Sequence, residues 1–366
     1  MTTGQPDLRF RPGVLAAAAY PLPSAGLDRG EYIRLDLNEA TRPVSPAVAD
    51  ALARHVRDHG VHAYPDEAGL RAAIAAYCGV SEEQVLATNG SDQAIDVCLR
   101  AFLGPGDTML VARPEFPMFG ITADLLEVRT RRVPYGPDLT FPYEAFRAAL
   151  AERPDLIVLI NPNNPTGTPV DVAFIEEVAR DYPTTPVIVD EAYFEFTGAT
   201  VVPLLATYPN LIVLRTFSKA FALAGLRLGY IVAHETVITQ LTKIRKPFDV
   251  NALAAVAARA QLAHIDEVQV YVKTLMDVVK PATVAFFEQH GVPIWPGAAN
   301  FVLVRPRDCA AVVSALRAER ILVRPMSAPA LAGMFRMGIG TEAEMARVME
   351  VYAGLLATGA GAGSEP

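Results

Sequence analysis

The sequence predicts an α/β protein with a mostly parallel sheet covered by helices on both faces, together with a smaller α+β domain. Up to about residue 260, short strands that are apolar throughout alternate with helical patterns, which is typical of a parallel sheet buried on both faces. Beyond that point, long helical patterns precede several short strands and a closing helix. The length of 366 residues fits one large domain or two medium ones, at about 100–200 residues each.

Local signals place the elements of the first part. Ser45-Pro46 supplies an N-cap and a proline at the first helical position, which predicts a helix through about Arg57. Further helices are expected from near Ser91 through Leu103 and from about Val170 to Tyr182. The expected strands are Met109–Ala112, Leu156–Ile160, Val187–Asp190 and Leu211–Thr216.

The second part is expected to form the smaller domain. Its helical patterns run to roughly Gln289, and its last helix is expected to begin at Glu342. Between them we expect the strands Asn300–Val304, Ile321–Val323 and Phe335–Ile339. We therefore predict a large domain over 41–260 and a small domain that combines 1–40 with 261–357. The small, glycine-rich residues of 358–366 predict a disordered tail.

Charge and hydropathy exclude several classes of function. The chain carries 32 Lys+Arg against 40 Asp+Glu, a net charge of −8, and no segment concentrates basic residues, so no nucleic-acid partner is expected. No apolar run approaches the length of about 18 residues that crosses a bilayer, so no membrane association is expected. The apolar stretch Val14–Tyr20 is short for a secretion signal and is followed by Pro21 and Pro23. We therefore expect a cytoplasmic protein.

The cysteines and histidines predict no metal site. Cys78, Cys98 and Cys309 are odd in number and scattered, which fits small buried side chains and neither a disulfide framework nor a zinc knuckle. His55 and His59 lie four residues apart, but their charged neighbours favour a solvated helix face over zinc ligation.

Polar segments follow three of the predicted strands. They are NPNNPTG after Ile160, DEAYFEF after Val189 and RTFSKAFALAGLR after Leu214. In open α/β sheets, ligands bind at the carboxyl ends of the strands, so we expect the functional site there. The dinucleotide motif GxGxxG and the phosphate-binding motif GxxxxGK[ST] are absent from the sequence, which disfavours NAD and ATP as ligands.

Lys219 is the candidate reactive residue of this site. It follows an apolar strand and lies among Thr216, Ser218, Phe217 and Phe221, which favours burial. A buried lysine is a candidate for Schiff-base formation. Bringing an amine with a pKa near 10.4 to its neutral form at pH 7 costs about 4–5 kcal/mol in water, and burial lowers this cost.

The other residues needed to bind pyridoxal 5′-phosphate are present. Asp190 can keep the ring nitrogen protonated, because an opposite charge at about 4–6 Å raises such a pKa by about 1–3. Gly90-Ser91-Asp92 opens a helix whose N-terminus can accept a phosphate, with Ser218 and Arg227 in support. Phe116 can supply an aromatic face.

The motifs NPNNPTG, DEAYFEF and RTFSKAFALAGLRLGY resemble those of the fold-type I aminotransferases, nearest to the histidinol-phosphate aminotransferase group. Matching stretches cover nearly the whole chain and include YPDEAGLRAAIAAY, TNGSDQAID, IRKPFDVNALA, AANFVLVRP and ILVRPM. The resemblance implies a large domain with a mostly parallel seven-stranded sheet between helices. It also implies pyridoxal 5′-phosphate as cofactor and a homodimer.

The resemblance assigns roles residue by residue. Lys219 is the lysine that binds the cofactor and moves the proton, Asp190 pairs with the pyridine nitrogen, and Asn164 and Tyr193 contact the ring oxygen O3′. The phosphate and ring contacts are Gly90, Ser91, Asp92, Thr216, Ser218, Arg227 and the stacking residue Phe116. Tyr64 reaches the phosphate of the other subunit. Substrate contacts are Arg336, Arg324, Tyr20 and Asn38.

Three stretches depart from the pattern of this group. Its NENP is Asn38-Glu39-Ala40-Thr41 here, its SDE is Ser91-Asp92-Gln93, and the segment Met326–Met334 lacks the usual glycine-rich form. All three are expected near the amino substrate, so the chemistry is better determined than the specificity.

The expected reaction is transamination between an amino donor and a 2-oxo acid, with L-histidinol phosphate and 2-oxoglutarate as the leading pair. An aromatic or specialised-pathway amino acid is the alternative within this class. A second class is a decarboxylase of a phosphorylated amino acid, which should form no pyridoxamine phosphate with its substrate. A third is a cofactor-binding sensor, which the presence of Lys219 disfavours.

Overall fold

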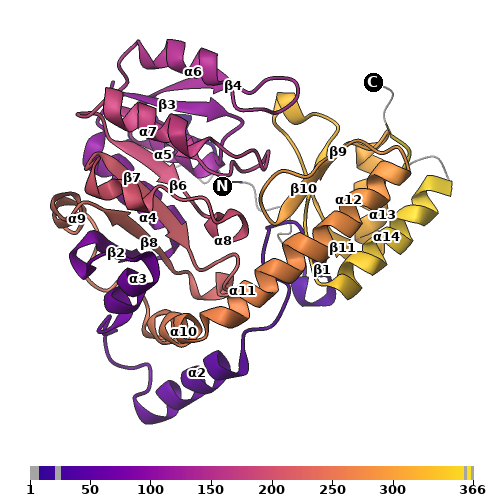
Figure 1. Ribbon diagram of the computed structural model, residues 1–366, viewed down its shortest axis with the longest axis horizontal. Helices are drawn as coiled ribbons and strands as arrows, with labels where there is room; N and C mark the ends of the chain where they lie inside the picture. Colours follow the sequence, from indigo (N-terminus) through magenta and orange to yellow (C-terminus); the bar gives the residue numbers. More distant parts are fainter. Residues whose placement is uncertain (1–7, 21–25, 358–360, 364–366) are drawn as a thin grey trace, which may run out of the picture.

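The computed structural model describes residues 8–20, 26–357 and 361–363. Its centre is a seven-stranded sheet in the order β2-β8-β7-β6-β5-β3-β4 (Figure 1). β8 runs antiparallel to both of its neighbours, and the other strands run parallel to one another. The expected mostly parallel sheet is confirmed. Its strands are β2 Val85–Thr88, β3 Thr108–Arg113, β4 Arg129–Pro134, β5 Leu156–Ile160, β6 Val187–Asp190, β7 Leu211–Thr216 and β8 Gly229–Ala233.

Both faces of this sheet are covered by helices. On β5, Ile157 and Leu159 belong to one apolar cluster, while Leu156, Val158 and Ile160 belong to another on the opposite face. This alternation explains why the central strands are apolar throughout. The first cluster includes side chains of α3 Leu70–Cys78, α6 Tyr143–Leu150, α7 Val172–Asp181 and α10 Ala252–Ala263, and the second includes those of α4 Gly90–Phe102, α5 Pro117–Leu125 and α9 Glu235–Leu241.

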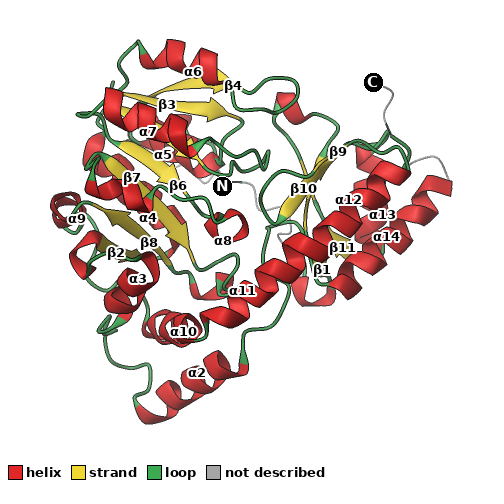
Figure 2. Cartoon of the chain, viewed as in Figure 1, coloured by secondary structure: helices red, strands yellow, loops and turns green. Residues whose placement is uncertain are grey.

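A second sheet lies beside the first (Figure 2). It is antiparallel, in the order β12-β13-β10-β9. Its strands are β9 Ile294–Trp295, β10 Phe301–Val304, β12 Arg324–Pro325 and β13 Phe335–Gly338. The helices of this part are α11 Ile265–Thr274, α12 Lys280–Gln289, α13 Cys309–Ala318 and α14 Glu342–Ala357, and a π-helical turn, Leu275–Val279, joins α11 to α12.

The start of the chain contributes to both parts. β1 (Ile33–Arg34) pairs in parallel with β11 (Ile321–Leu322) of the C-terminal part. α2 (Pro46–Asp58) extends away from the central sheet (Figure 1). The short helices α1 (Pro12–Ala16) and α8 (Phe194–Thr197) complete the set. The proposed division into domains at residues 41, 261 and 357 stays a prediction.

Helix caps account for small differences from the expected boundaries. α2 begins as expected, with the Ser45 hydroxyl accepting from the backbone N–H of Val48. α7 begins two residues later than expected, because Asp171 acts as its N-cap and accepts from the N–H of Ala173. In the tail, 358–360 and 364–366 lie outside the described residues. Gly363 forms a β-bridge with Pro306, so Gly361–Gly363 differ from the expected disorder.

No helix among the described residues is long and apolar enough to cross a membrane.

Candidate active site

The carboxyl ends of three adjacent strands meet the antiparallel sheet. Asp190 ends β6, Lys219 follows β7, and Asn164 follows β5. Arg336 of β13 donates to Asn164 Oδ1 at 2.5 Å and to the Asp36 carbonyl at 2.9 Å. One of the expected strand-end residues, Asn164, is therefore joined to an arginine 172 residues distant in sequence.

Lys219 is held in a partly buried position by the N-terminal segment. Its ammonium Nζ donates to the carbonyl oxygen of Leu37 at 2.8 Å and lies 5.9 Å from the ring centroid of Tyr193. Burial, reinforced by the positive charge of Arg336, lowers the pKa of Lys219 to about 8. An amine with this pKa is deprotonated far more readily than a surface lysine, as a nucleophile requires.

Asp190 is a carboxylate almost without solvent contact. Its side chain accepts from the N–H of Ala192 at 3.0 Å, and its residue is 4% exposed. Burial, and to a smaller extent the charges of Asp92 and Glu191, raises the pKa of Asp190 to about 7. A cationic ring N–H at this carboxylate would favour its ionised form, so the environment suits a pyridinium partner.

Tyr193 is placed by Asn38 and Phe301. Its hydroxyl oxygen accepts from Asn38 Nδ2 at 2.9 Å, and its ring packs edge-on against Phe301 at 5.3 Å. Burial raises the pKa of Tyr193 to about 12, so this phenol stays a neutral hydrogen-bond donor at physiological pH.

Two arginines lie side by side on the antiparallel sheet. Arg324 of β12 and Arg336 of β13 are register partners. The guanidinium of Arg324 lies 5.8 Å from the ring centroid of Tyr20, and that of Arg336 lies 5.4 Å from the ring of Phe301. Together they present two positive charges near Lys219, which suits acidic substrates.

The N-terminus of α4 forms the other end of the site. Arg227 follows β7 after a turn, donates to Ser218 Oγ at 3.4 Å and pairs with the Asp92 carboxylate at 3.1 Å. The Thr216 hydroxyl accepts from the N–H of Ser218 at 3.1 Å. Because the Asp92 carboxylate already pairs with Arg227, Asp92 can offer a phosphate its backbone N–H but not its side chain.

A side chain at position 90 would be strained at this end of the site. The φ of Gly90 is +76°, in the region that favours glycine. A Cβ there would also lie 2.7 Å from Nη2 of Arg227. The absence of a side chain lets the guanidinium lie against the first turn of α4, where backbone N–H groups and a positive charge together bind anions.

Two of the predicted residues lie apart from this hydrogen-bonded cluster. Phe116 is the N-cap of α5 and packs partly buried beside the core of the sheet. Tyr64 is 80% exposed and stacks on Phe248, with ring centroids 4.5 Å apart. Within one chain, therefore, Tyr64 contributes nothing to the cluster around Lys219.

The site residues fit pyridoxal 5′-phosphate. The cluster contains an unpaired buried acceptor, Asn38 Oδ1, and an unpaired buried donor, Arg336 Nε, and such atoms are costly unless a ligand or water meets them. The buried carboxylate of Asp190 suits a ring N–H, the amine of Lys219 suits an aldehyde, and the Gly90–Arg227 end suits a phosphate.

Several residues of the cluster were missed by sequence reasoning. The carbonyl of Leu37 holds Lys219, and Asn300 donates to the carbonyl of Asn38 at 3.2 Å. Asn163 donates to the Pro114 carbonyl and the Thr166 hydroxyl, both at 2.9 Å. Asn163 could have been chosen from the NPNNPTG motif, whereas a backbone carbonyl such as that of Leu37 leaves no signal in the sequence.

The three departures from the family pattern are structurally distinct. The Glu39 carboxylate pairs with Arg29 at 2.6 Å. The segment between Arg324 and Arg336 is held in place by Leu331 and Met334, which are buried against Leu303. Gln93 contacts the N–H of Asn89 and the carboxylate of Asp249, next to the Asp92–Arg227 pair, and its expected place near the amino substrate stays a prediction.

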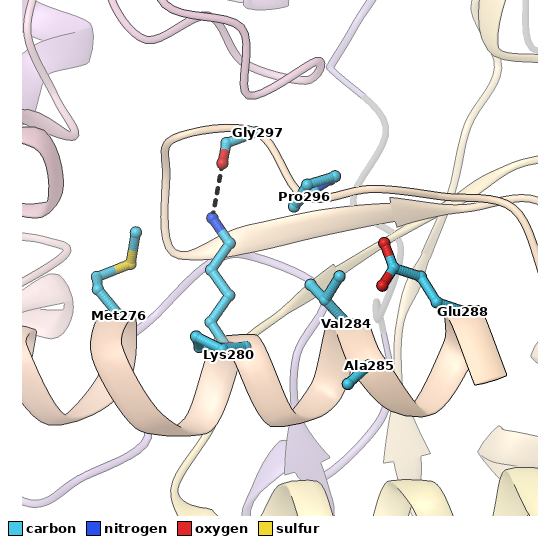
Figure 3. A pocket seen from close by; sticks show the side chains of 8 residues that line it. Met276, Lys280, Val284, Ala285, Glu288, Pro296 and Gly297 are labelled. Carbon is cyan, nitrogen blue, oxygen red and sulfur yellow. Dashed lines mark hydrogen bonds between the residues drawn. The ribbon is translucent and has the colours of Figure 1, made fainter.

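A surface hollow of about 370 Å³ lies away from this cluster, beside α12. Figure 3 shows Lys280 at its edge, with Nζ donating to the Gly297 carbonyl at 2.9 Å. Lys280 also donates to the Ala299 carbonyl at 2.7 Å, and burial lowers its pKa to about 8. Since the N–H of Ala298 donates to the Gly167 carbonyl, Lys280 supports the loop that touches the NPNNPTG segment.

No cluster of His, Cys, Asp or Glu suited to a metal occurs within the described part of the chain.

Comparison with known proteins agrees with this arrangement. Residues 30–351 match the family model described as aminotransferase class I and II. The chain is 36% identical to the histidinol-phosphate aminotransferase of Thermobifida fusca over 364 residues, 96% of each chain. It is also 36% identical to that of Roseiflexus castenholzii over 336 residues, 89% of this chain and 90% of the relative. The crystal structure of histidinol-phosphate aminotransferase from Sinorhizobium meliloti in complex with pyridoxal-5′-phosphate superposes with a TM-score of 0.84 at 26% identity, covering 95% of this chain and 98% of that one.

Proposed function

The chain belongs to the class I and II aminotransferase family, and from this we propose that it transfers the amino group of L-histidinol phosphate to 2-oxoglutarate. The products are imidazole acetol phosphate and glutamate, and the cofactor is pyridoxal 5′-phosphate. The observation that carries the proposal is the meeting of Lys219, Asp190 and Arg336 at the strand ends. The relatives named histidinol-phosphate aminotransferase, at 36% identity over about nine-tenths or more of the chain, support the choice of donor.

The cofactor, when bound, supplies an aldehyde that captures amines and a protonated ring that withdraws electrons from the substrate Cα. Lys219 Nζ is the group that binds this aldehyde in the resting enzyme. The same amine would serve as the base and acid that moves the proton of the substrate Cα. Its pKa of about 8 lets one nitrogen act as base and as acid near neutral pH.

The surrounding residues orient and tune this chemistry. The Asp190 carboxylate holds the proton on the ring nitrogen, and Tyr193 and Asn164 hydrogen-bond the ring oxygen. Ser91, the backbone of Asp92, Thr216, Ser218 and Arg227 hold the phosphate, and Phe116 covers the ring. Arg336 and Arg324, with Tyr20 and Asn38, bind the acidic groups of the two substrates, which enter one after the other.

The absorption spectrum of the purified protein tests the proposal. L-Histidinol phosphate, added without any oxo acid, should convert the yellow cofactor to the pyridoxamine form, and 2-oxoglutarate should restore it. A yellow protein that responds instead to an aromatic amino acid would favour the alternative donor class. Release of carbon dioxide from a phosphorylated amino acid, without the pyridoxamine form, would indicate a decarboxylase.

We also propose a homodimer in which Tyr64 reaches the cofactor phosphate of the partner subunit. The 80% exposed Tyr64 and the 52% exposed Phe248 stacked on it are suited to a protein–protein contact, where aromatic residues are enriched. Mixing Tyr64→Ala subunits with Lys219→Ala subunits should restore activity, because a mixed dimer contains one complete site. Failure to restore activity in proven mixed dimers would contradict the shared site.

The cytoplasmic location of the protein stays a prediction.

A further inference from the structure

Gln93 links the first turn of α4 to a distant loop. The backbone N–H of Asn89 donates to Gln93 Oε1 at 2.7 Å. Since a backbone N–H can only donate, this contact identifies the amide oxygen and fixes the orientation of the side chain. The amide nitrogen Nε2 then donates to Asp249 Oδ2 at 2.5 Å, across 156 residues of sequence.

The loop that contains Asp249 leads back to Arg227. Asp249 Oδ2 also accepts from the N–H of Lys246 at 3.1 Å. Two residues further on, Asn251 Nδ2 donates to the carbonyl of Leu226 at 3.0 Å. Leu226 directly precedes Arg227 in the chain. The backbone of Arg227 has a positive φ of 54°, and its guanidinium pairs with Asp92 of α4.

These contacts form a closed circuit around the phosphate end of the site. It runs from α4 through Gln93 and Asp249 to Asn251, then through Leu226 to Arg227 and back to α4 at Asp92. The Gln93–Asp249 hydrogen bond is the contact that joins the loop to the helix. The pairing of Thr88 with Gly229 places the start of α4 close to the chain that follows Arg227. Beyond that backbone pairing, the link through Gln93 is supplemented by the Asp92–Arg227 pair, whose two side chains are each 45% exposed and therefore weakly coupled.

We infer that Gln93 and Asp249 are a pair of positioning residues for the cofactor phosphate. They act through the first turn of α4 and the backbone of Arg227. They keep this turn and Arg227 at a distance at which both can hydrogen-bond the same phosphate group. The inference rests on the proposed cofactor but not on the proposed substrate. It also explains a departure in sequence, because a carboxylate at position 93 would face the carboxylate of Asp249.

The polarity of the pair can be reversed without changing its charge. The change Gln93→Glu places two carboxylates against each other and removes the donor. Adding Asp249→Asn restores one donor and one acceptor between the two side chains, with the same net charge as the original pair, although the N–H of Lys246 then loses the oxygen that accepts from it. Asp249→Asn alone keeps an oxygen that can accept from Gln93 Nε2.

The experiment is a double-mutant cycle on cofactor affinity. Dissociation constants for pyridoxal 5′-phosphate and for pyridoxal, which lacks the phosphate, are measured on the apoproteins by visible absorption. Gln93→Glu should weaken binding of the phosphorylated form about tenfold, in the range measured for coupled neighbours, and leave the pyridoxal affinity within about twofold. Asp249→Asn alone should change neither affinity by more than about twofold, and the double variant should recover most of the affinity that Gln93→Glu loses.

Three other results contradict the inference, and a fourth concerns the substrate alone. Equal losses for pyridoxal and its phosphate would indicate a general structural defect, which thermal melting of the apoproteins would also reveal. If the effects of the two substitutions on affinity were additive, and Asp249→Asn alone strengthened binding, the cause would be the electrostatic effect of the charges on the phosphate. The hydrogen bond between the two side chains would then have no positioning role. Failure of the original protein to bind pyridoxal 5′-phosphate would refute the cofactor and the inference together. Binding without any response to L-histidinol phosphate would refute the substrate alone.

Discussion

Replacing Asp190 by Asn should stabilise the apoprotein while it disables the enzyme. In the folded chain, burial raises the pKa of Asp190 to about 7 from its ordinary value of 3.8. A group whose pKa is raised on folding binds its proton more tightly in the native state, so its contribution to stability is present at acidic pH and is lost between about pH 4 and pH 7. The full loss corresponds to about 4 kcal/mol.

The asparagine amide cannot ionise and keeps an oxygen to accept from the N–H of Ala192. The advantage of Asp190→Asn should therefore grow by about 2–3 kcal/mol between pH 5 and pH 8. For a chain of 366 residues, an unfolding entropy of about 0.8 kcal/mol/K converts this to about 3 °C in melting temperature. Apoproteins are compared by calorimetry at both pH values.

The control is Asp96→Asn, which removes an exposed carboxylate on α4 that pairs with Arg100. It should change stability by less than about 1 kcal/mol at either pH. With cofactor bound, Asp190→Asn should lower turnover between about 10-fold and 1000-fold, since the ring nitrogen loses a partner that raises its pKa by about 1–3. Equal melting of the two apoproteins at pH 8 would refute the burial argument, and full turnover would refute the pairing with the ring nitrogen.

Three further predictions concern the lysines and the arginine. Lys219→Ala should remove the lysine-bound absorption band and lower transamination about 1000-fold or more, because no other amine replaces its proton transfer; a normal rate would contradict the mechanism. A lysine in Arg336→Lys cannot keep both of the contacts to Asn164 and Asp36. The KM for 2-oxoglutarate should therefore rise about 10–100-fold, with a smaller change in kcat. An unchanged KM would show that Arg336 does not bind this substrate. Lys280→Met should leave the carbonyls of Gly297 and Ala299 without their donor and cost about 2 kcal/mol, a drop of about 3 °C in melting temperature. The control Glu288→Gln, on the exposed side of α12, should melt like the original protein, and an equal result for Lys280→Met would show that the loop needs no support.

Much of the central sheet could be predicted because its signals are local. The strands Leu156–Ile160, Val187–Asp190 and Leu211–Thr216 were predicted to the residue, since burial on both faces makes them apolar from end to end. The strands β2, β4 and β8 were not identified. For β4 the reason lies in its sequence, RTRRVP. It is the edge strand of the sheet, where charged side chains are tolerated and protect against aggregation, so it carries no apolar run.

The candidate residues at the strand ends were predicted for the same reason. Asp190 ends an apolar strand and Lys219 follows another by three residues, and the topology of a parallel sheet brings such positions to one edge. Arg336 and Asn38 came from motif resemblance, since nothing in their local sequence indicates that they meet Asn164 and Tyr193. Their roles toward cofactor and substrate stay predictions that the variants above can test.

The sequence by itself determined the class of fold, several of the central strands and the position of Lys219 and Asp190 at the strand ends. Each of these depends on residues that are neighbours along the chain, where periodicity and motif spacing act. Only the tertiary structure decided that the Leu37 carbonyl holds Lys219, that Arg336 reaches Asn164, and that Gln93 meets Asp249. These contacts join residues 156–182 positions apart. Such pairings are fixed by the packing of the whole chain, because no local pattern specifies which distant group meets a given side chain.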